Sequence, residues 1–287
     1  MEVTHHEIRR AVRAALAEDL GSGDATTLAT IPASAKSVAL MNARERLTVA
    51  GISFAEFAFR ELSPGIQIKK IARDGQRVRA GAALLKISGS SRAILSAERV
   101  ALNFVQRLSG VATATTQFVD TVKGTSARIL DTRKTTPGWR RFEKYAVACG
   151  GGKNHRIGLF DMILIKDNHL VALQSAKPNA IAAAVAHARK KFPKLKVEVE
   201  ADTLKQVVQA VAAGADIILL DNMSSTQLRQ AVNIVKGHAK TEASGGVNLQ
   251  TVRSIAQTGV DFISVGAITH SARAVDIGLD FEAGAKP

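Results

Sequence analysis

The sequence predicts an α/β fold, because the order of its segments and its composition agree. After residue 127, short apolar runs alternate with longer stretches of helical spacing. The 287 residues are 46% hydrophobic and 4% aromatic, with only 6 prolines. This composition is typical of an ordered protein rich in small aliphatic side chains, which would bury about three quarters of the unfolded surface. Length allows one large domain or two ordinary ones.

The first third of the chain mixes helical and strand patterns. We expect helices over residues 7–20, 53–62 and 94–122, and strands over residues 37–47, 66–71 and 83–87. The hairpin around Asp74-Gly75 somewhat resembles that of a biotinyl or lipoyl carrier. No lysine marks its tip, so a plain β-turn scaffold is favoured.

The last two thirds alternate strand and helix. Strands are expected at 128–130, 162–165, 196–199, 216–220, 240–243 and 261–265, with helices at 180–191, 204–213, 226–235 and 249–257. This order indicates a parallel sheet with crossover helices, which either closes into a barrel or stays an open, doubly wound sheet. No G-x-G-x-x-G follows a first strand, so nothing favours a dinucleotide fold.

Several classes of protein are disfavoured. Cys149 is the single cysteine, so an intrachain disulfide is impossible and a structural zinc site is unsupported. The N-terminus is charged without a signal-peptide core, and no apolar run approaches membrane-helix length. We therefore expect a cytoplasmic protein without membrane partners.

The net charge of +14 permits two interpretations. One is a phosphate-binding face for nucleic acid, and the other is a basic surface with a cationic pocket for a small anion. The 39 Lys and Arg residues are dispersed, and the chain has one Trp and one Tyr for stacking on bases. The small anion is favoured, and no nucleic-acid partner is expected.

Polar or glycine residues follow every expected strand of the second part, and carboxyl ends of parallel strands form the active sites of such folds. Three zones result. A cationic zone suits carboxylates and phosphates, an acidic pair suits Mg²⁺, and glycines let backbone N–H groups approach a phosphate. The cationic zone contains Arg133, Lys134, His155, Arg156 and Lys166. The acidic pair is Glu200 and Asp221, and the glycine-rich zone contains Ser244, Gly245, Gly246 and Gly266. We expect a small organic anion and a magnesium-bound sugar phosphate as substrates.

Longer motifs resemble those of the quinolinate phosphoribosyltransferase family. They span nearly the whole chain in order: residues 18–24, 97–103, 131–138, 150–156, 165–169, 220–222, 243–246 and 264–270. The blocks 131–138 and 150–156 are highly specific. Departures at Ala25, Trp139 and Lys153 fall between residues that would touch substrate.

The resemblance implies an N-terminal α/β open sandwich plus a C-terminal incomplete (β/α) barrel. The sandwich would comprise residues 1–112, completed by residues 272–287, and the barrel residues 113–271. The implied reaction transfers phosphoribose from phosphoribosyl pyrophosphate to quinolinate with decarboxylation, giving nicotinate mononucleotide, CO₂ and pyrophosphate for NAD biosynthesis. It implies Mg²⁺, no organic cofactor and a homodimer.

The resemblance also implies residue roles. Arg133, His155, Arg156 and Lys166 would hold quinolinate, joined by Arg99 from the partner subunit. Lys134 would contact pyrophosphate, and Glu200 and Asp221 would hold the ribose hydroxyls and Mg²⁺. The 5′-phosphate would be received by Ser244, Gly245, Gly246, Gly266 and His270.

Two alternatives stay open. One is a relative on the same fold, either a protein encoded beside molybdate-transport genes or an enzyme that uses the mono-acid nicotinate. The cationic set favours a dicarboxylate, because a single carboxylate does not require so many positive groups. The other is a non-catalytic binder of phosphates or RNA, which predicts salt-sensitive binding without turnover.

Overall fold

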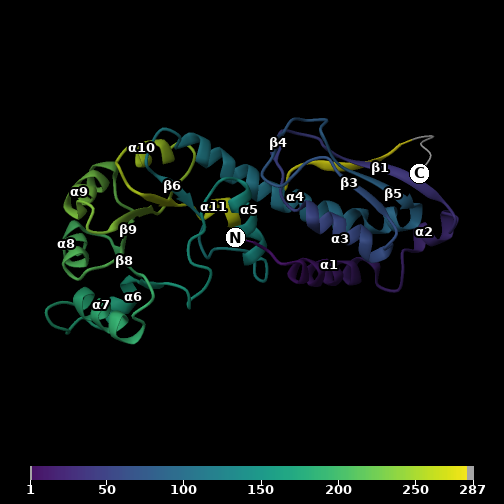
Figure 1. Cartoon of the computed structure of the whole chain (residues 1–287). Helices are drawn as coiled ribbons and strands as arrows, with labels where there is room; N and C mark the ends of the chain where they lie inside the picture. Colours follow the sequence, from purple (N-terminus) through teal and green to yellow (C-terminus); the bar gives the residue numbers. More distant parts are fainter. Residues whose placement is uncertain (1, 283–287) are drawn as a thin grey trace. The chain divides into compact units, whose positions relative to one another are not determined.

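The computed structural model describes residues 2–282, which divide into two compact units (Figure 1). The second unit comprises residues 117–140 and 152–271. The first unit is assembled from the three remaining stretches, up to residue 116, from 141 to 151 and from 272 onward. The expected boundary at residue 112 lies inside the helix α4 (Ser91–Thr121), which is unbroken there.

The first unit contains a four-stranded antiparallel sheet. Its strands are ordered β12 (Ile277–Phe281), β1 (Lys36–Ala43), β5 (Ala83–Ser90) and β3 (Gln67–Lys70). β1 lies between β5 and β12, so the last described strand pairs with the first. The short strands β2 (Leu47–Thr48) and β4 (Arg77–Val78) form a separate ribbon.

Helices α1 (His5–Leu20), α2 (Ala25–Thr30) and α3 (Ile52–Leu62) complete this part with most of α4. Thr4 and Glu7 cap each other's backbone N–H at the start of α1, which stabilises that end. Figure 1 shows α3 beneath the sheet, with α1 beside it. Phe54 of α3 stacks on Phe104 of α4 with ring centroids 5.0 Å apart, as expected for a buried helical stripe.

The second unit is a six-stranded parallel sheet with helices between its strands. The order is β6 (Arg128–Leu130), β11 (Phe262–Ser264), β10 (Lys240–Ser244), β9 (Ile217–Asp221), β8 (Val197–Ala201) and β7 (Ile163–Ile165). The helices α7 (Ala180–Lys191), α8 (Leu204–Ala212), α9 (Ser225–Val235) and α10 (Val252–Ala256) alternate with them. Within the described residues, the end strands β6 and β7 do not pair with each other. The predicted fold class is therefore confirmed.

Four helices had no predicted counterpart: α2 (Ala25–Thr30), α5 (Arg140–Cys149), α6 (Asp167–Val171) and α11 (Ala267–His270). The strand expected over 37–47 is divided into β1 and β2. Among residues 2–282, no helix combines the length and the hydrophobicity that a membrane span requires.

Candidate functional site

The strand register places the expected site residues on one face of the parallel sheet. Glu200 pairs with Leu219, and Asp221, two residues further along β9, pairs with Ser244. Residues two apart in a strand point to the same face, so these side chains share a face. Lys166 follows Ile165, which pairs with Val199, and therefore joins Glu200 on that face. The alternate residues of β8 are Val197, Val199 and Ala201, which are fully buried.

Lys166 and Glu200 lie close together on this face, and both side chains are partly exposed. The Lys166 Nζ lies 3.4 Å from Oε2 of Glu200. On the next strand, Oδ2 of Asp221 accepts a hydrogen bond of 2.7 Å from Nδ2 of Asn222. Glu200 and Asp221 each keep part of their surface exposed, so their oxygens remain accessible to a ligand or an ion.

Two guanidinium groups converge beside these strands. Burial, and next the charge of Arg133, lower the pKa of Arg156. The Arg156 Nη1 donates to the carbonyl of Met162 over 3.1 Å. The Nε of Arg133 is buried, with no hydrogen-bonding partner among residues 2–282. A buried donor without a partner is costly, so this arrangement suits an anionic ligand.

Lys134 lies beside the end of β11. A Cβ built on Gly266 would be 3.3 Å from Cδ of Lys134 and 3.0 Å from Nε2 of His270. The Thr269 hydroxyl donates to the carbonyl of Lys134 over 2.7 Å, which connects α11 to the loop after β6. Lys134 and His270 are both exposed. The side chains of Lys134 and His270 therefore lie next to the backbone of Gly266.

The loop after β10 has tight backbone geometry. Gly245 has φ +96°, and a Cβ there would lie 2.1 Å from Oδ1 of Asn222. Gly246 also has positive φ, at +58°, but its Cβ would meet nothing within 4 Å. Asn222 is itself left-handed, with φ 53°, and its N–H donates to the carbonyl of Ser244 over 2.9 Å. This loop therefore exposes backbone atoms next to Asp221, as expected for a phosphate cradle.

Arg99 is the expected site residue that lies in the first unit. It is exposed on α4. The other expected site residues all belong to the second unit.

The sequence interpretation missed Glu242 of β10. It is 1% exposed and, with Glu198 and His155, forms a group whose ligand-type atoms all lie within 4.8 Å of one another. Glu242 pairs with Leu219, the same residue that pairs with Glu200, so it shares their face. The alternation of Glu242 with Ser244 on β10 is the signal that could have revealed it.

Glu242→Gln should remove a pH-dependent loss of stability. Burial, and then the charge of Glu198, raise the pKa of Glu242 above its ordinary value of 4.5. As pH rises past that value, the unfolded chain releases this proton and the folded chain keeps it. The free energy of unfolding therefore falls by about 1.4 kcal/mol per pH unit until the folded pKa is passed. The free energy of unfolding, measured with urea from about pH 5 to about pH 7, should fall more steeply with pH in the wild type than in Glu242→Gln. The same pH dependence in both proteins would contradict this prediction.

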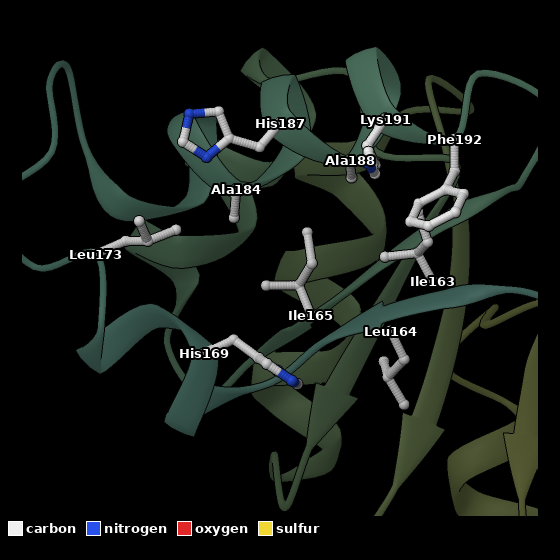
Figure 2. A pocket seen from close by; sticks show the side chains of 10 residues that line it. All are labelled: Ile163, Leu164, Ile165, His169, Leu173, Ala184, His187, Ala188, Lys191 and Phe192. Carbon is white, nitrogen blue, oxygen red and sulfur yellow. The ribbon is translucent and has the colours of Figure 1, made fainter. Parts of the chain in front are cut away.

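A groove elsewhere in the second unit has different chemistry (Figure 2). It encloses ≈ 280 Å³ beside β7 and α7, and Figure 2 shows Ile165 pointing into it between Ala184 and His169. None of the expected site residues lines it. Its mostly aliphatic lining does not suit a polyanion, so the converging cationic groups remain the candidate site.

Comparisons with known proteins identify the family of the chain. The family models named quinolinate phosphoribosyl transferase match over both domains, the N-terminal domain at residues 24–109 and the C-terminal domain at residues 111–280. A chloroplastic nicotinate-nucleotide pyrophosphorylase (carboxylating) of Arabidopsis thaliana is 42% identical, over 96% of this chain and 83% of the relative. The Mycobacterium leprae enzyme of the same name is 44% identical, over 95% of this chain and 96% of the relative. The solved structure of the Francisella tularensis nicotinate-nucleotide pyrophosphorylase superposes with a TM-score of 0.92 at 43% identity, covering 98% of each chain. The chain therefore belongs to the quinolinate phosphoribosyltransferase family.

Proposed function

We propose that the protein transfers phosphoribose from phosphoribosyl pyrophosphate to quinolinate and releases CO₂ and pyrophosphate, giving nicotinate mononucleotide. The observation that carries this proposal is the pair Arg133 and Arg156, whose positive charges lie close together with a buried, unpartnered Arg133 Nε. Two close guanidinium groups repel each other unless an anion lies between them. A dicarboxylate supplies two negative groups, each able to accept paired N–H donors.

In this proposal, quinolinate is held by Arg133, His155, Arg156 and Lys166. The guanidinium groups orient its carboxylates, and the ring nitrogen is thereby presented to the ribose. Such orientation removes much of the entropic barrier to a two-substrate reaction.

The phosphoribosyl substrate would occupy the other two zones. Gly245, Gly246 and Gly266 offer backbone atoms for the 5′-phosphate, with Ser244 and His270 beside them. Lys134 would contact the pyrophosphate. The carboxylates of Glu200 and Asp221 share a face and keep exposed surface, so they fit a hard cation such as Mg²⁺ and would hold it with the ribose hydroxyls. When bound, Mg²⁺ would neutralise negative charge on the pyrophosphate.

The chemistry follows from these placements. The ring nitrogen bonds to C1 of the ribose as the C1–O bond to pyrophosphate breaks, and the pyrophosphate leaves with that electron pair. Lys134 stabilises the leaving group, while Glu200 and Asp221 face the positive charge developing on the ribose. The bond to the carboxylate next to the ring nitrogen then breaks, and CO₂ leaves. The electron pair remains on the ring carbon beside the positive nitrogen and takes up a proton from solvent.

A product assay tests this function. Purified protein is mixed with quinolinate, phosphoribosyl pyrophosphate and Mg²⁺, and nicotinate mononucleotide is measured by mass spectrometry. Omission of Mg²⁺ in the presence of a chelator should abolish the product. If nicotinate is accepted and quinolinate is not, the protein uses the mono-acid and the proposal is wrong. The cytoplasm remains a prediction, since plant relatives include proteins named chloroplastic or mitochondrial.

Subunit sharing predicts complementation between two inactive variants. The proposal makes the protein a homodimer in which Arg99 completes the partner's site and Lys134 acts in its own. Arg99→Ala and Lys134→Ala should each be inactive alone, whereas mixed dimers should recover part of the activity because one of two sites is intact. Subunits are exchanged under mild denaturant and activity is measured before and after. Lack of recovery, with mixed dimers demonstrated by differently tagged chains, would contradict the shared site.

A further inference from the structure

One continuous segment of the second unit has no acidic residue. Residues 168–197, between Asp167 and Glu198, contain neither Asp nor Glu. The segment contains two histidines and these six basic residues: Lys177, Arg189, Lys190, Lys191, Lys194 and Lys196. Although Lys and Arg are dispersed over the whole chain, no acid within this segment offsets them. The acid-free segment, residues 168–197, therefore supplies six positive charges to the net charge of +14.

The lysines around the end of α7 carry charges that the described residues do not neutralise. Arg189 pairs with Asp216 over 2.8 Å, and the charge of Lys196 also acts on Asp216. Lys190, Lys191 and Lys194 are exposed, and none of them forms an ion pair within residues 2–282. Unpaired like charges on one surface raise the local concentration of anions. This end of α7 therefore attracts negatively charged groups.

The groove shown in Figure 2 borders the same segment. On α7, Ala184 and Ala188 lie one turn apart, and their small side chains leave the space open. His187 and Lys191 are also one turn apart, line the groove and are exposed. No carboxylate is present in its lining. The groove therefore favours an occupant that is apolar inside it and negatively charged at its edge.

The size of the groove favours a single side chain over an enclosed small molecule. Its ≈ 280 Å³ is below the range of about 300–1,000 Å³ that is usual for sites of drug-sized ligands. Phe192 is 51% exposed and adds apolar surface beside it. Lys190 and Lys194 do not line the groove, so a ligand that meets them must continue beyond it. A polypeptide can insert one apolar side chain and place acidic side chains outside.

We propose that the groove between β7 and α7 binds an acidic polypeptide segment through one inserted aliphatic side chain. The acidic residues of this partner face Lys190, Lys191 and Lys194, which gives charge complementarity at an exposed rim. This inference does not depend on the proposed function.

Two other occupants fit the surface less well. Phe192 is the one aromatic residue of Phe, Trp or Tyr type in the acid-free segment, whereas single-stranded nucleic acid is held by several stacked aromatic side chains. A second copy of the chain that paired this surface with itself would bring like charges together.

Fluorescence anisotropy with a labelled peptide tests the proposal on the full-length protein. The probe carries one leucine between two short runs of glutamate. We expect saturable, one-to-one binding that weakens as salt is added, because exposed charges are screened. Replacing the leucine by serine, or the glutamates by glutamines, should each weaken binding by about tenfold or more. Absence of saturable binding, or equal binding of the glutamine peptide, would overturn the inference.

Substitutions in the protein locate the site. Lys191→Glu reverses a charge at the edge of the groove and should weaken binding of the probe by about fivefold or more. Ala188→Leu fills part of the groove and should weaken it by about tenfold. Lys205→Glu is the matched control, because Lys205 is exposed on α8 outside the acid-free segment, and it should change the affinity by less than about twofold.

Circular dichroism and thermal unfolding establish that each variant is folded. Lys191 is exposed, so Lys191→Glu decides the question even if Ala188→Leu does not fold. Equal losses in Lys191→Glu and Lys205→Glu would show that net charge alone attracts the probe, and the proposed site would be wrong.

Two competitors complete the test. An RNA oligonucleotide that binds more tightly than the peptide, and loses affinity in Lys191→Glu, would make this a nucleic-acid surface and overturn the proposal. Vesicles containing phosphatidylserine that behave in the same way would make it a membrane surface, with the same consequence. All these measurements are made without substrates, so they decide the proposal whether or not the protein makes nicotinate mononucleotide.

Discussion

Gly245→Ala should lower kcat/KM for phosphoribosyl pyrophosphate by about 10²-fold or more, as expected when a binding loop is misplaced by an ångström. The added Cβ would lie 2.1 Å from Oδ1 of Asn222, and the backbone has φ +96°. The loop must therefore move away from the end of β9, and Asn222 with it. Since Asn222 donates to Asp221, the change reaches both the phosphate cradle and the proposed metal ligand. Steady-state kinetics with each substrate varied in turn would measure it.

Gly214→Ala is the matched control. Gly214 also has positive φ, at +74°, but a Cβ there would meet nothing within 4 Å, and it precedes the opposite end of β9. This variant should lose about 1–2 kcal/mol of stability from backbone strain and keep its activity. Equal loss of activity in both variants would show that loop strain alone, and not the approach to Asn222, explains the effect.

Arg107→Ala should destabilise the protein by about 3–5 kcal/mol, because it removes an ion-pair partner of a buried carboxylate. Nη2 of Arg107 donates to Oε1 of Glu143 over 2.7 Å, and Glu143 is completely buried on α5. Nη1 of the same guanidinium donates to the carbonyl of Ala272 over 2.5 Å. Urea unfolding monitored by circular dichroism at neutral pH would measure the difference.

Two companion variants define the cause. Arg107→Met combined with Glu143→Gln removes both charges and should recover a large part of the loss. Lys123→Ala breaks an exposed ion pair with Asp120, whose side chains are 66% and 37% exposed, and should cost less than about 1 kcal/mol. If the double variant were no more stable than Arg107→Ala, packing of the arginine and not the buried charge would be the cause.

Apolar periodicity explains which elements could be predicted from the sequence. The helix expected at residues 180–191 is α7 itself, and the strand expected at residues 128–130 is β6. Both patterns are local, because the side chains that define them repeat within a few residues. The polar residues after each strand could also be recognised in the sequence. Their meeting at one edge of the sheet could be predicted because parallel strands have their carboxyl ends at the same edge.

The missed features depend on contacts between distant residues. α5 carries Glu143 and Lys144, which resemble solvated charges in the sequence but are fully buried. Glu242 was overlooked for the same reason, because a single carboxylate inside a strand gives no local sign of its partners. Burial of charge depends on partners that a linear pattern does not identify.

The pairing of β12 with β1 has a consequence for how the protein is made. During translation the ribosome releases β1 early, whereas residues 277–281 emerge only after the whole second unit has been synthesised. Until then the nascent chain carries an unpaired β1 edge, with main-chain groups open to pairing with other polypeptides. The barrel segment can fold before β12 completes the sandwich. Deletion of β12 should thus impair biogenesis, through aggregation of new chains, even though it removes none of the proposed substrate ligands.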